Sequence, residues 1–147
     1  MSITAWQFEH SVVCNASRSF AWSFWTDVSN WERLEGATVE WIKIDGPFAA
    51  GTLGATKSPG QDPQYWKITQ LDLERSATIE VTLDGAVFKN RMVLESITQE
   101  QTRIIQRMSL AGEKAAGFAE GMRMFETSAP QGLGKLAKAI ESAYEDL

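Results

Sequence analysis

The chain has 147 residues, 44% hydrophobic and 22% charged, and its 14 basic and 19 acidic residues give a formal net charge of -5. These proportions are those of an ordinary globular protein and exclude a disordered or fibrous chain, so we expect one domain, 1–147. The basic residues are scattered and form no cationic block that could follow a phosphate backbone, so nucleic acid is not an expected partner.

The first predicted element is a half-buried strand with a period of two. Apolar residues and one histidine share one face, with polar residues opposite; the shared face carries Trp6, Phe8, His10 and Val12. Asn15 or Ser17 can then cap a short helix, because their side chains accept hydrogen bonds from the free amides of a first turn. A second short helix is expected to start near Asp27 and to end before Gly36.

Between residues 38 and 110 the sequence indicates antiparallel strands joined by turns. The expected strands cover 39–44, 52–56, 66–73, 78–83, 87–97 and 103–110. Asp84-Gly85 is a strong hairpin signal, because both central positions of the favoured two-residue turn take a positive φ.

The chain closes with apolar residues at helical spacing, which predict one long helix lying across the sheet. The apolar stripe consists of Phe118, Met122, Phe125, Ala129, Leu133, Leu136, Ile140, Tyr144 and Leu147. Pro130 lies inside this segment, where it removes an amide donor and crowds the carbonyl of Glu126, so a kink or a restart is expected there.

Three predicted strand faces carry a single polar residue between apolar neighbours, and these residues are His10, Asn90 and Gln106. A buried imidazole or amide without a partner costs about 1–3 kcal/mol, so such groups need each other, water or a ligand. We interpret them as the lining of a partly wet cavity. The alternatives are that they bond to backbone or water in a closed core, or that strand bulges turn them outward.

The candidate ligand-binding residues follow from these inward faces and from the terminal helix. They are His10, Phe8, Trp66, Asn90, Met92, Gln106, Met108, Phe118, Met122 and Phe125. His10 is the only catalytic candidate, because an imidazole titrates near neutral pH. The alternation places Glu80, Arg91 and Arg107 on the opposite, outward face. The six tryptophans are either core residues or the walls of a flat-sided pocket.

Several classes of site are not expected. One His and one Cys cannot form a zinc site, and no calcium loop, nucleotide-binding glycine motif or Gly-x-Ser-x-Gly elbow is present, so we predict no metal and no cofactor. The first six residues lack a basic region followed by an apolar run, which predicts no signal peptide and a cytoplasmic location. Apolar runs fall far short of the ~20 residues that span a bilayer, so no membrane insertion is expected.

Weak marks along nearly the whole chain together resemble a known superfamily. The marks are Asn15-Ala16-Ser17, Trp22 and Trp25, Asp27 with Trp31, Gly46-Pro47, Gly51-Thr52, Trp66-Lys67-Ile68, and Thr102-Arg103-Ile104 running to Ala111-Gly112. With the order strand, two short helices, about six strands and a long helix, the chain resembles the START-related helix-grip superfamily (SRPBCC), which includes polyketide cyclase/dehydrase-like and lipid-transport proteins.

The resemblance implies an α+β helix-grip fold. In this fold a seven-stranded curved antiparallel sheet, two short helices and a long C-terminal helix enclose a cavity for an apolar ligand. The Asp27 to Trp31 and Gly51-Thr52 marks are structural in the family, so no catalytic residue carries over. Pro130 stands where the family's helix usually continues, which affects the shape of the cavity mouth.

Our leading hypothesis is binding or transport of a hydrophobic or aromatic small molecule (a lipid, sterol or polyketide-like compound) by a monomer or homodimer. The second is a polyketide cyclase or dehydratase that uses His10, with Asn90 or Gln106 positioning the substrate. The third is a chaperone-associated regulatory domain that binds its partner through its exposed surface.

Overall fold

The computed structural model describes residues 4–147, so the part of the signal-peptide expectation that concerns residues 1–3 lies outside the described chain. The elements in chain order are β1 (Thr4–Cys14), α1 (Arg18–Trp25), α2 (Val28–Glu35), β2 (Trp41–Ile44), β3 (Leu53–Lys57), β4 (Gln64–Asp72), β5 (Ser76–Leu83), β6 (Ala86–Thr98), β7 (Gln101–Ala111), α3 (Ala119–Met122) and α4 (Phe125–Glu145). Short 3-10 turns cover Gly36–Thr38 and Ala115–Gly117.

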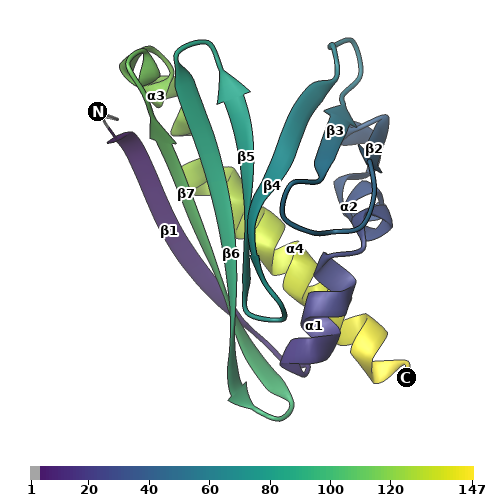
Figure 1. Cartoon of the computed structure of the whole chain (residues 1–147). Coiled ribbons are helices and arrows are strands. Elements are labelled where there is room, and N and C mark those ends of the chain that lie inside the picture. The colour runs from purple at the N-terminus through teal and green to yellow at the C-terminus, as the bar shows by residue number, and fades with distance from the viewer. Residues whose placement is uncertain (1–3) are drawn as a thin grey trace.

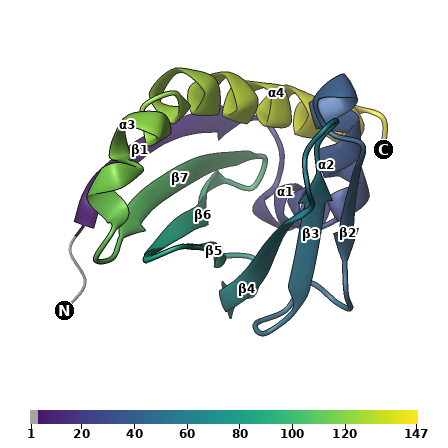
Figure 2. The same cartoon turned by 90° about the horizontal axis from the view of Figure 1, so that it is seen from above.

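The seven strands form one antiparallel sheet in the order β1-β7-β6-β5-β4-β3-β2. Seen from above, the sheet curves, and α4 runs over its inner face along β1 (Figure 2). Helices α1 and α2 lie at the end of the sheet where α4 finishes (Figure 1). The predicted α+β class with seven curved strands is confirmed, and the predicted boundaries of β2 to β7 agree within two residues.

Both short helices begin at the predicted capping residues. Ser17 accepts a hydrogen bond from the amide of Phe20 at 3.2 Å and starts α1. Asp27 accepts one from the amide of Ser29 at 3.1 Å and starts α2. In each case the side-chain oxygen satisfies an amide that has no partner within the helix. These caps fix the chain direction between β1 and β2.

The terminal segment differs from the single bent helix that the sequence predicts. It contains the short helix α3, a break at Arg123 and Met124, and then α4. The restart therefore precedes Pro130, which lies in the second turn of α4, where helical structure continues. The apolar stripe also ends earlier than predicted, because Leu147 lies beyond α4 and is 85% exposed.

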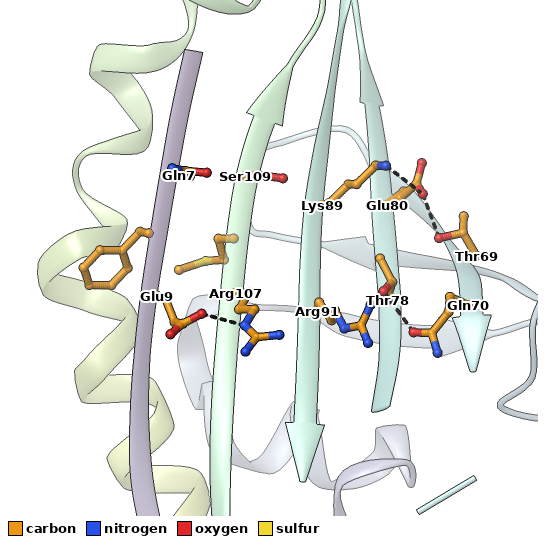
Figure 3. A pocket seen from close by; sticks show the side chains of 12 residues that line it. Gln7, Glu9, Thr69, Gln70, Thr78, Glu80, Lys89, Arg91, Arg107 and Ser109 are labelled. Carbon is orange, nitrogen blue, oxygen red and sulfur yellow. Dashed lines mark hydrogen bonds and ion pairs between the residues drawn. The ribbon is translucent and has the colours of Figure 1, made fainter. Parts of the chain in front are cut away.

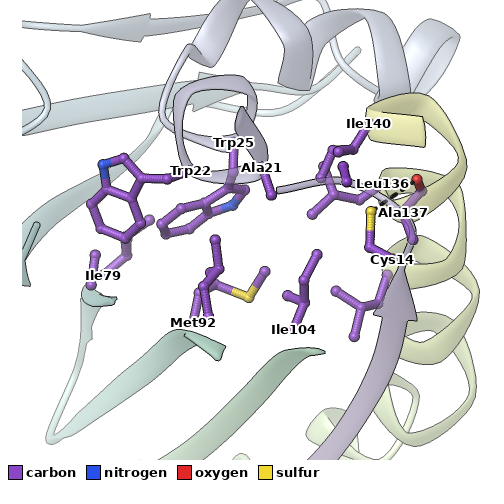
Figure 4. Close-up of a cluster of buried hydrophobic side chains, with 14 of the residues drawn as sticks. Cys14, Ala21, Trp22, Trp25, Ile79, Met92, Ile104, Leu136, Ala137 and Ile140 are labelled. Carbon is purple, nitrogen blue, oxygen red and sulfur yellow. Dashed lines mark hydrogen bonds between the residues drawn. The ribbon is translucent and has the colours of Figure 1, made fainter. Parts of the chain in front are cut away.

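The buried apolar residues form two clusters, which we call the large and the small cluster. The large cluster joins α1 and the second half of α4 to the sheet, and Figure 4 shows part of it; its buried members include Cys14, Trp22, Trp25, Trp66, Ile68, Ile79, Met92, Leu94, Ile104, Leu133, Leu136, Ala137 and Ile140. The small cluster lies at the other end and contains Trp6, Ala86, Met108, Leu110 and Ala115, with Phe8, Phe88, Phe118, Met122 and Phe125 packed against it.

Four of the six tryptophans belong to the large cluster, where neighbouring rings contact one another. Ring centroids are 5.9 Å apart for Trp22 and Trp25, 6.0 Å for Trp25 and Trp31, and 5.6 Å for Trp31 and Trp66. Large rings bury much apolar area per residue, so this group stabilises the end of the sheet where the strands are shortest. Trp41 lies apart from it, under the ammonium group of Lys43.

Gly54 provides a direct test of this packing, because a Cβ there would lie 2.2 Å from the Trp66 ring. We expect Gly54→Ala to displace that ring and to lower the free energy of unfolding by about 1–3 kcal/mol. Gly132→Ala in α4 is the matched control, since its Cβ meets nothing within 4 Å; it should raise stability by up to about 1 kcal/mol. Urea denaturation measures the free energy of unfolding of both variants and of the wild-type protein. An equal change of this free energy in Gly54→Ala and Gly132→Ala would contradict the contact between Gly54 and Trp66.

Cys14 joins the end of β1 to α4, where its thiol donates to the carbonyl of Ala137 at 3.5 Å. Burial, with a smaller contribution from Glu141, raises the pKa of this thiol from 9.0 to about 12. Between pH 9 and pH 12 the thiol of Cys14 stays protonated in the folded chain but ionises in the unfolded chain. Ionisation of this thiol therefore lowers the free energy of unfolding as the pH rises through that range.

We predict that wild-type protein loses more stability between pH 8 and pH 10.5 than Cys14→Ala does, measured by urea denaturation at both pH values. An equal loss in the two proteins would contradict the raised pKa.

Candidate functional site

The three predicted polar residues meet on the inner face of the sheet. The strand register places His10 of β1 opposite Gln106 of β7. Asn90 of β6 is diagonal to Gln106, two residues before the Met92 that pairs with it. The imidazole Nε2 of His10 lies 2.7 Å from Oε1 of Gln106. The amide Nε2 of Gln106 donates to Oδ1 of Asn90 at 3.0 Å. The three side chains thus form one hydrogen-bonded chain across three strands, which we call the polar relay.

The direction of the polar relay follows from the chemistry of its groups. Gln106 donates from its amide nitrogen to Asn90, so its oxygen faces His10 and can only accept. Nε2 of His10 must therefore carry a proton, and in the neutral imidazole Nδ1 is left as an acceptor. Asn90 accepts with its oxygen and keeps its amide hydrogens as donors.

Two atoms of the polar relay, Nδ1 of His10 and Nδ2 of Asn90, have no hydrogen-bond partner within the described residues. None of the buried side-chain nitrogen or oxygen atoms in residues 4–147 lacks a partner. Both free atoms are therefore reachable from solvent. The relay offers one acceptor and one donor to a molecule lying against the inner face.

Aromatic rings border the polar relay on one side. Phe8 stacks on His10 with ring centroids 5.2 Å apart, and it also stacks on Trp6 at 6.4 Å. Phe125 of α4 lies 6.3 Å from Trp6 and stacks on Phe88 of β6 at 5.5 Å. These rings present flat apolar surfaces next to the relay's free donor and acceptor.

The middle of the inner face is less deeply buried than its two ends. Phe8, His10, Phe88, Asn90 and Gln106 point toward the face that α4 covers, yet each is only partly buried. We call these five residues the central strip. It lies between the large and small clusters, and its partial exposure gives a ligand access to both rings and polar atoms.

The predicted ligand-binding residues fall into three groups: members of the central strip, residues beside it, and one residue away from it. His10, Asn90, Gln106 and Phe8 belong to the central strip. The remaining predicted residues flank it or lie away from it.

Met92 and Met108 are each 3% exposed and flank the central strip, in the large and small clusters respectively. Phe118, Met122 and Phe125 pack against the small cluster from the terminal segment. Trp66 is 6% exposed inside the tryptophan group, where its indole nitrogen donates to Thr56 at 3.1 Å, so the structure does not bring it to the relay.

Two residues of the site are missing from the sequence-based prediction. Phe88 could have been included, because strand alternation places it on the same face as Asn90. Glu126 of α4 accepts a hydrogen bond from the indole nitrogen of Trp6 at 2.9 Å. No local pattern indicates that contact, which joins residues 120 positions apart in the sequence.

Hollows are also found away from the polar relay, although Phe8 contributes to the lining of one of them. One, of about 770 Å³, crosses the outer face of the sheet, which the helices leave uncovered (Figure 3). The other, of about 510 Å³, lies between β4 and β5, whose pairing stops at Lys67 and Glu80. Its lining includes Val81, which pairs with Phe88 of the central strip. The second hollow is therefore separated from Phe88 of the central strip only by the pairing of β5 with β6.

Within residues 4–147, no group of three or more His, Cys, Asp or Glu side chains is arranged to hold a metal ion. None of the helices in this part of the chain is both long and apolar enough to cross a bilayer.

Comparison with known proteins finds likeness in structure but not in sequence. No family model and no curated protein matches the chain. Norcoclaurine synthase from Thalictrum flavum superposes with a TM-score of 0.73 at 15% identity, over 95% of this chain and 87% of that one. The ZhuI aromatase/cyclase from Streptomyces sp. R1128 gives 0.66 at 16% identity, over 92% and 93%. Ara h 8.0201 gives 0.72 at 15% identity, over 97% and 99%.

These structures share the curved seven-stranded sheet with a long C-terminal helix. Identities this low establish shared architecture and leave activity open. The chain therefore has the helix-grip fold that its sequence predicts.

Proposed function

We propose that this protein binds a flat, largely apolar small molecule on the central strip, between the sheet and α4. The observation that carries the proposal is a set of partly exposed aromatic rings beside a polar relay that keeps one acceptor and one donor free. Binding sites for small molecules commonly combine apolar walls with a few placed polar groups.

The aromatic rings favour a planar ligand. Phe8 and Phe88 are partly exposed, and covering their faces with an apolar molecule removes that area from water at about 25 cal/mol per Å². Stacked or edge-on ring contacts add about 0.5–1.5 kcal/mol per pair beyond the area term. A flat aromatic molecule uses both effects.

The polar relay favours a ligand with polar groups at its edge. Nδ1 of His10 accepts from a hydroxyl group, and the amide of Asn90 donates to a carbonyl or hydroxyl oxygen. A hydroxylated aromatic compound satisfies both atoms, whereas a saturated lipid leaves both without a partner. In support, a crystal structure of norcoclaurine synthase, which shares this fold, holds dopamine and hydroxybenzaldehyde, two hydroxylated aromatic compounds.

The first test compares 2-naphthol with naphthalene, two probes that differ by one hydroxyl group. We expect 2-naphthol to bind wild-type protein about tenfold more tightly, since one hydrogen bond contributes about 1 kcal/mol or slightly more. His10→Phe should remove this preference while naphthalene still binds. Isothermal titration calorimetry measures both affinities.

Ser109→Ala, on the outer face of β7, is the matched control and should retain the preference. If neither probe binds wild-type protein, the proposed function fails. If both bind equally, the role of the polar relay fails while apolar binding stands.

Catalysis at the same place is a second candidate, favoured by the fixed tautomer of His10. With Nε2 held by Gln106, Nδ1 is free to take a proton from a carbon next to a carbonyl group of a bound substrate. Proton removal of this kind starts aldol-type ring closures, and one protein that shares the fold is an aromatase/cyclase.

For this candidate we predict that the protein accelerates deuterium exchange at the carbon next to the carbonyl of 6-hydroxy-1-tetralone, followed by NMR in D₂O. His10→Gln should abolish the acceleration and leave binding of the ketone intact. Unchanged exchange in this variant would reject the role of His10 as a base.

A further inference from the structure

The outer face of the sheet carries a row of polar side chains in direct cross-strand register. Across β1, β7, β6, β5 and β4 the row reads Glu9, Arg107, Arg91, Thr78 and Gln70. All five line the hollow of about 770 Å³ (Figure 3). A second row beside it contains Ser109, Lys89 and Glu80. Phe8 and Met108 also contribute to the lining, and we call this hollow the outer groove.

Most members of the outer groove are paired with one another. Nε of Arg107 donates to Glu9 at 2.5 Å, and Thr78 donates to Gln70 at 3.1 Å. Lys89 lies 4.0 Å from Glu80, whose other contact is a hydrogen bond from Thr69 at 2.7 Å. Both carboxylates of the groove are therefore engaged by groups of the protein.

Arg91, at the centre of the groove, is a charged member without such a partner. Its side chain takes part in no hydrogen bond or ion pair within residues 4–147. Arg107 is directly opposite on β7, and Lys89 is two residues away on the same face of β6. Like charges directly opposite each other in a sheet are destabilising. Glu9 and Glu80 already offset Arg107 and Lys89, so three positive charges against two negative ones leave the groove with one net positive charge, at Arg91, which favours an anion there.

The two arginines have the geometry for such an anion. Arg107 uses Nε for Glu9, which leaves both terminal nitrogens of its guanidinium as donors. Arg91 keeps all of its donors, and Figure 3 shows both side chains lying over the same part of the sheet. Guanidinium groups bind carboxylates and phosphates through paired hydrogen bonds that a lysine cannot reproduce.

We propose that the outer groove is a second binding site, for a small molecule that carries a phosphate or carboxylate group held between Arg91 and Arg107. The volume of about 770 Å³ is within the range of small-molecule sites. The site is on the opposite face of the sheet from the central strip and does not depend on the function proposed there. Its ligand is anionic and polar, unlike the apolar molecule of the inner face.

The test is a titration of ¹⁵N-labelled protein with inorganic phosphate, and separately with citrate, at low and constant ionic strength, because salt screens exposed charges. We expect saturable shifts of the Nε–Hε signals of Arg91 and Arg107 with at least one of the two anions. Arg91→Gln should weaken that binding about tenfold, as expected for charge-assisted hydrogen bonds. Arg91→Lys, which keeps the charge but loses the fork, should weaken it as well.

Arg103→Gln is the matched control. Arg103 is on the outer face of β7, opposite Glu95 and outside the groove lining, so this variant changes the net charge equally and should retain binding. Three results would overturn the proposal: shifts that rise without saturation for both anions, equal weakening by Arg91→Gln and Arg103→Gln, or binding of an acidic hexapeptide in the absence of any binding of phosphate or citrate.

Discussion

The register of β1, β7 and β6 is the constraint on which the candidate site depends. It places His10 opposite Gln106 and brings Asn90 within reach of the same amide, so each polar side chain finds a partner on the next strand. A shift of one residue in the β1–β7 pairing would turn His10 to the outer face, and a shift in the β6–β7 pairing would separate Asn90 from Gln106. The two apolar clusters hold that register from both ends of the sheet.

Packing at the two ends explains why the middle stays accessible. The large cluster fixes α1 and the second half of α4 against the sheet, and the small cluster fixes the start of the terminal segment. Between them α4 lies mainly over β1, as Figure 2 shows, and Phe88, Asn90 and Gln106 on the inner face of β6 and β7 are only partly covered. The protein thus combines two well-packed ends with a polar and aromatic strip that stays partly exposed between them.

Much of this architecture could be predicted from local sequence patterns. The alternation in β1 and the capping residues Ser17 and Asp27 act over a few residues and are present as predicted. The hairpin at Asp84-Gly85 forms too, but only Gly85 has the positive φ that was predicted for both positions. The inward direction of the three polar residues follows from the same alternation. The break at Arg123 and Met124 could not be predicted, because no proline or cap marks it.

Contacts between distant residues account for the rest of what sequence reasoning missed. The hydrogen bond from Trp6 to Glu126 and the burial of Trp66 among other tryptophans depend on how α4, α2 and the sheet pack together. Alternation predicts that the side chain of Arg91 points outward. It does not predict that Glu9 and Glu80 pair with other cations and leave Arg91 without an ion pair.

The most direct test of the central claim is the ¹⁵N chemical shifts of the two ring nitrogens of His10 at a pH where the ring is neutral, with and without 2-naphthol. The polar relay requires the proton on Nε2 and a bare Nδ1, whose signal moves when the naphthol hydroxyl donates to it. A proton on Nδ1 in the free protein, or an Nδ1 signal that does not respond to saturating 2-naphthol, would contradict the account.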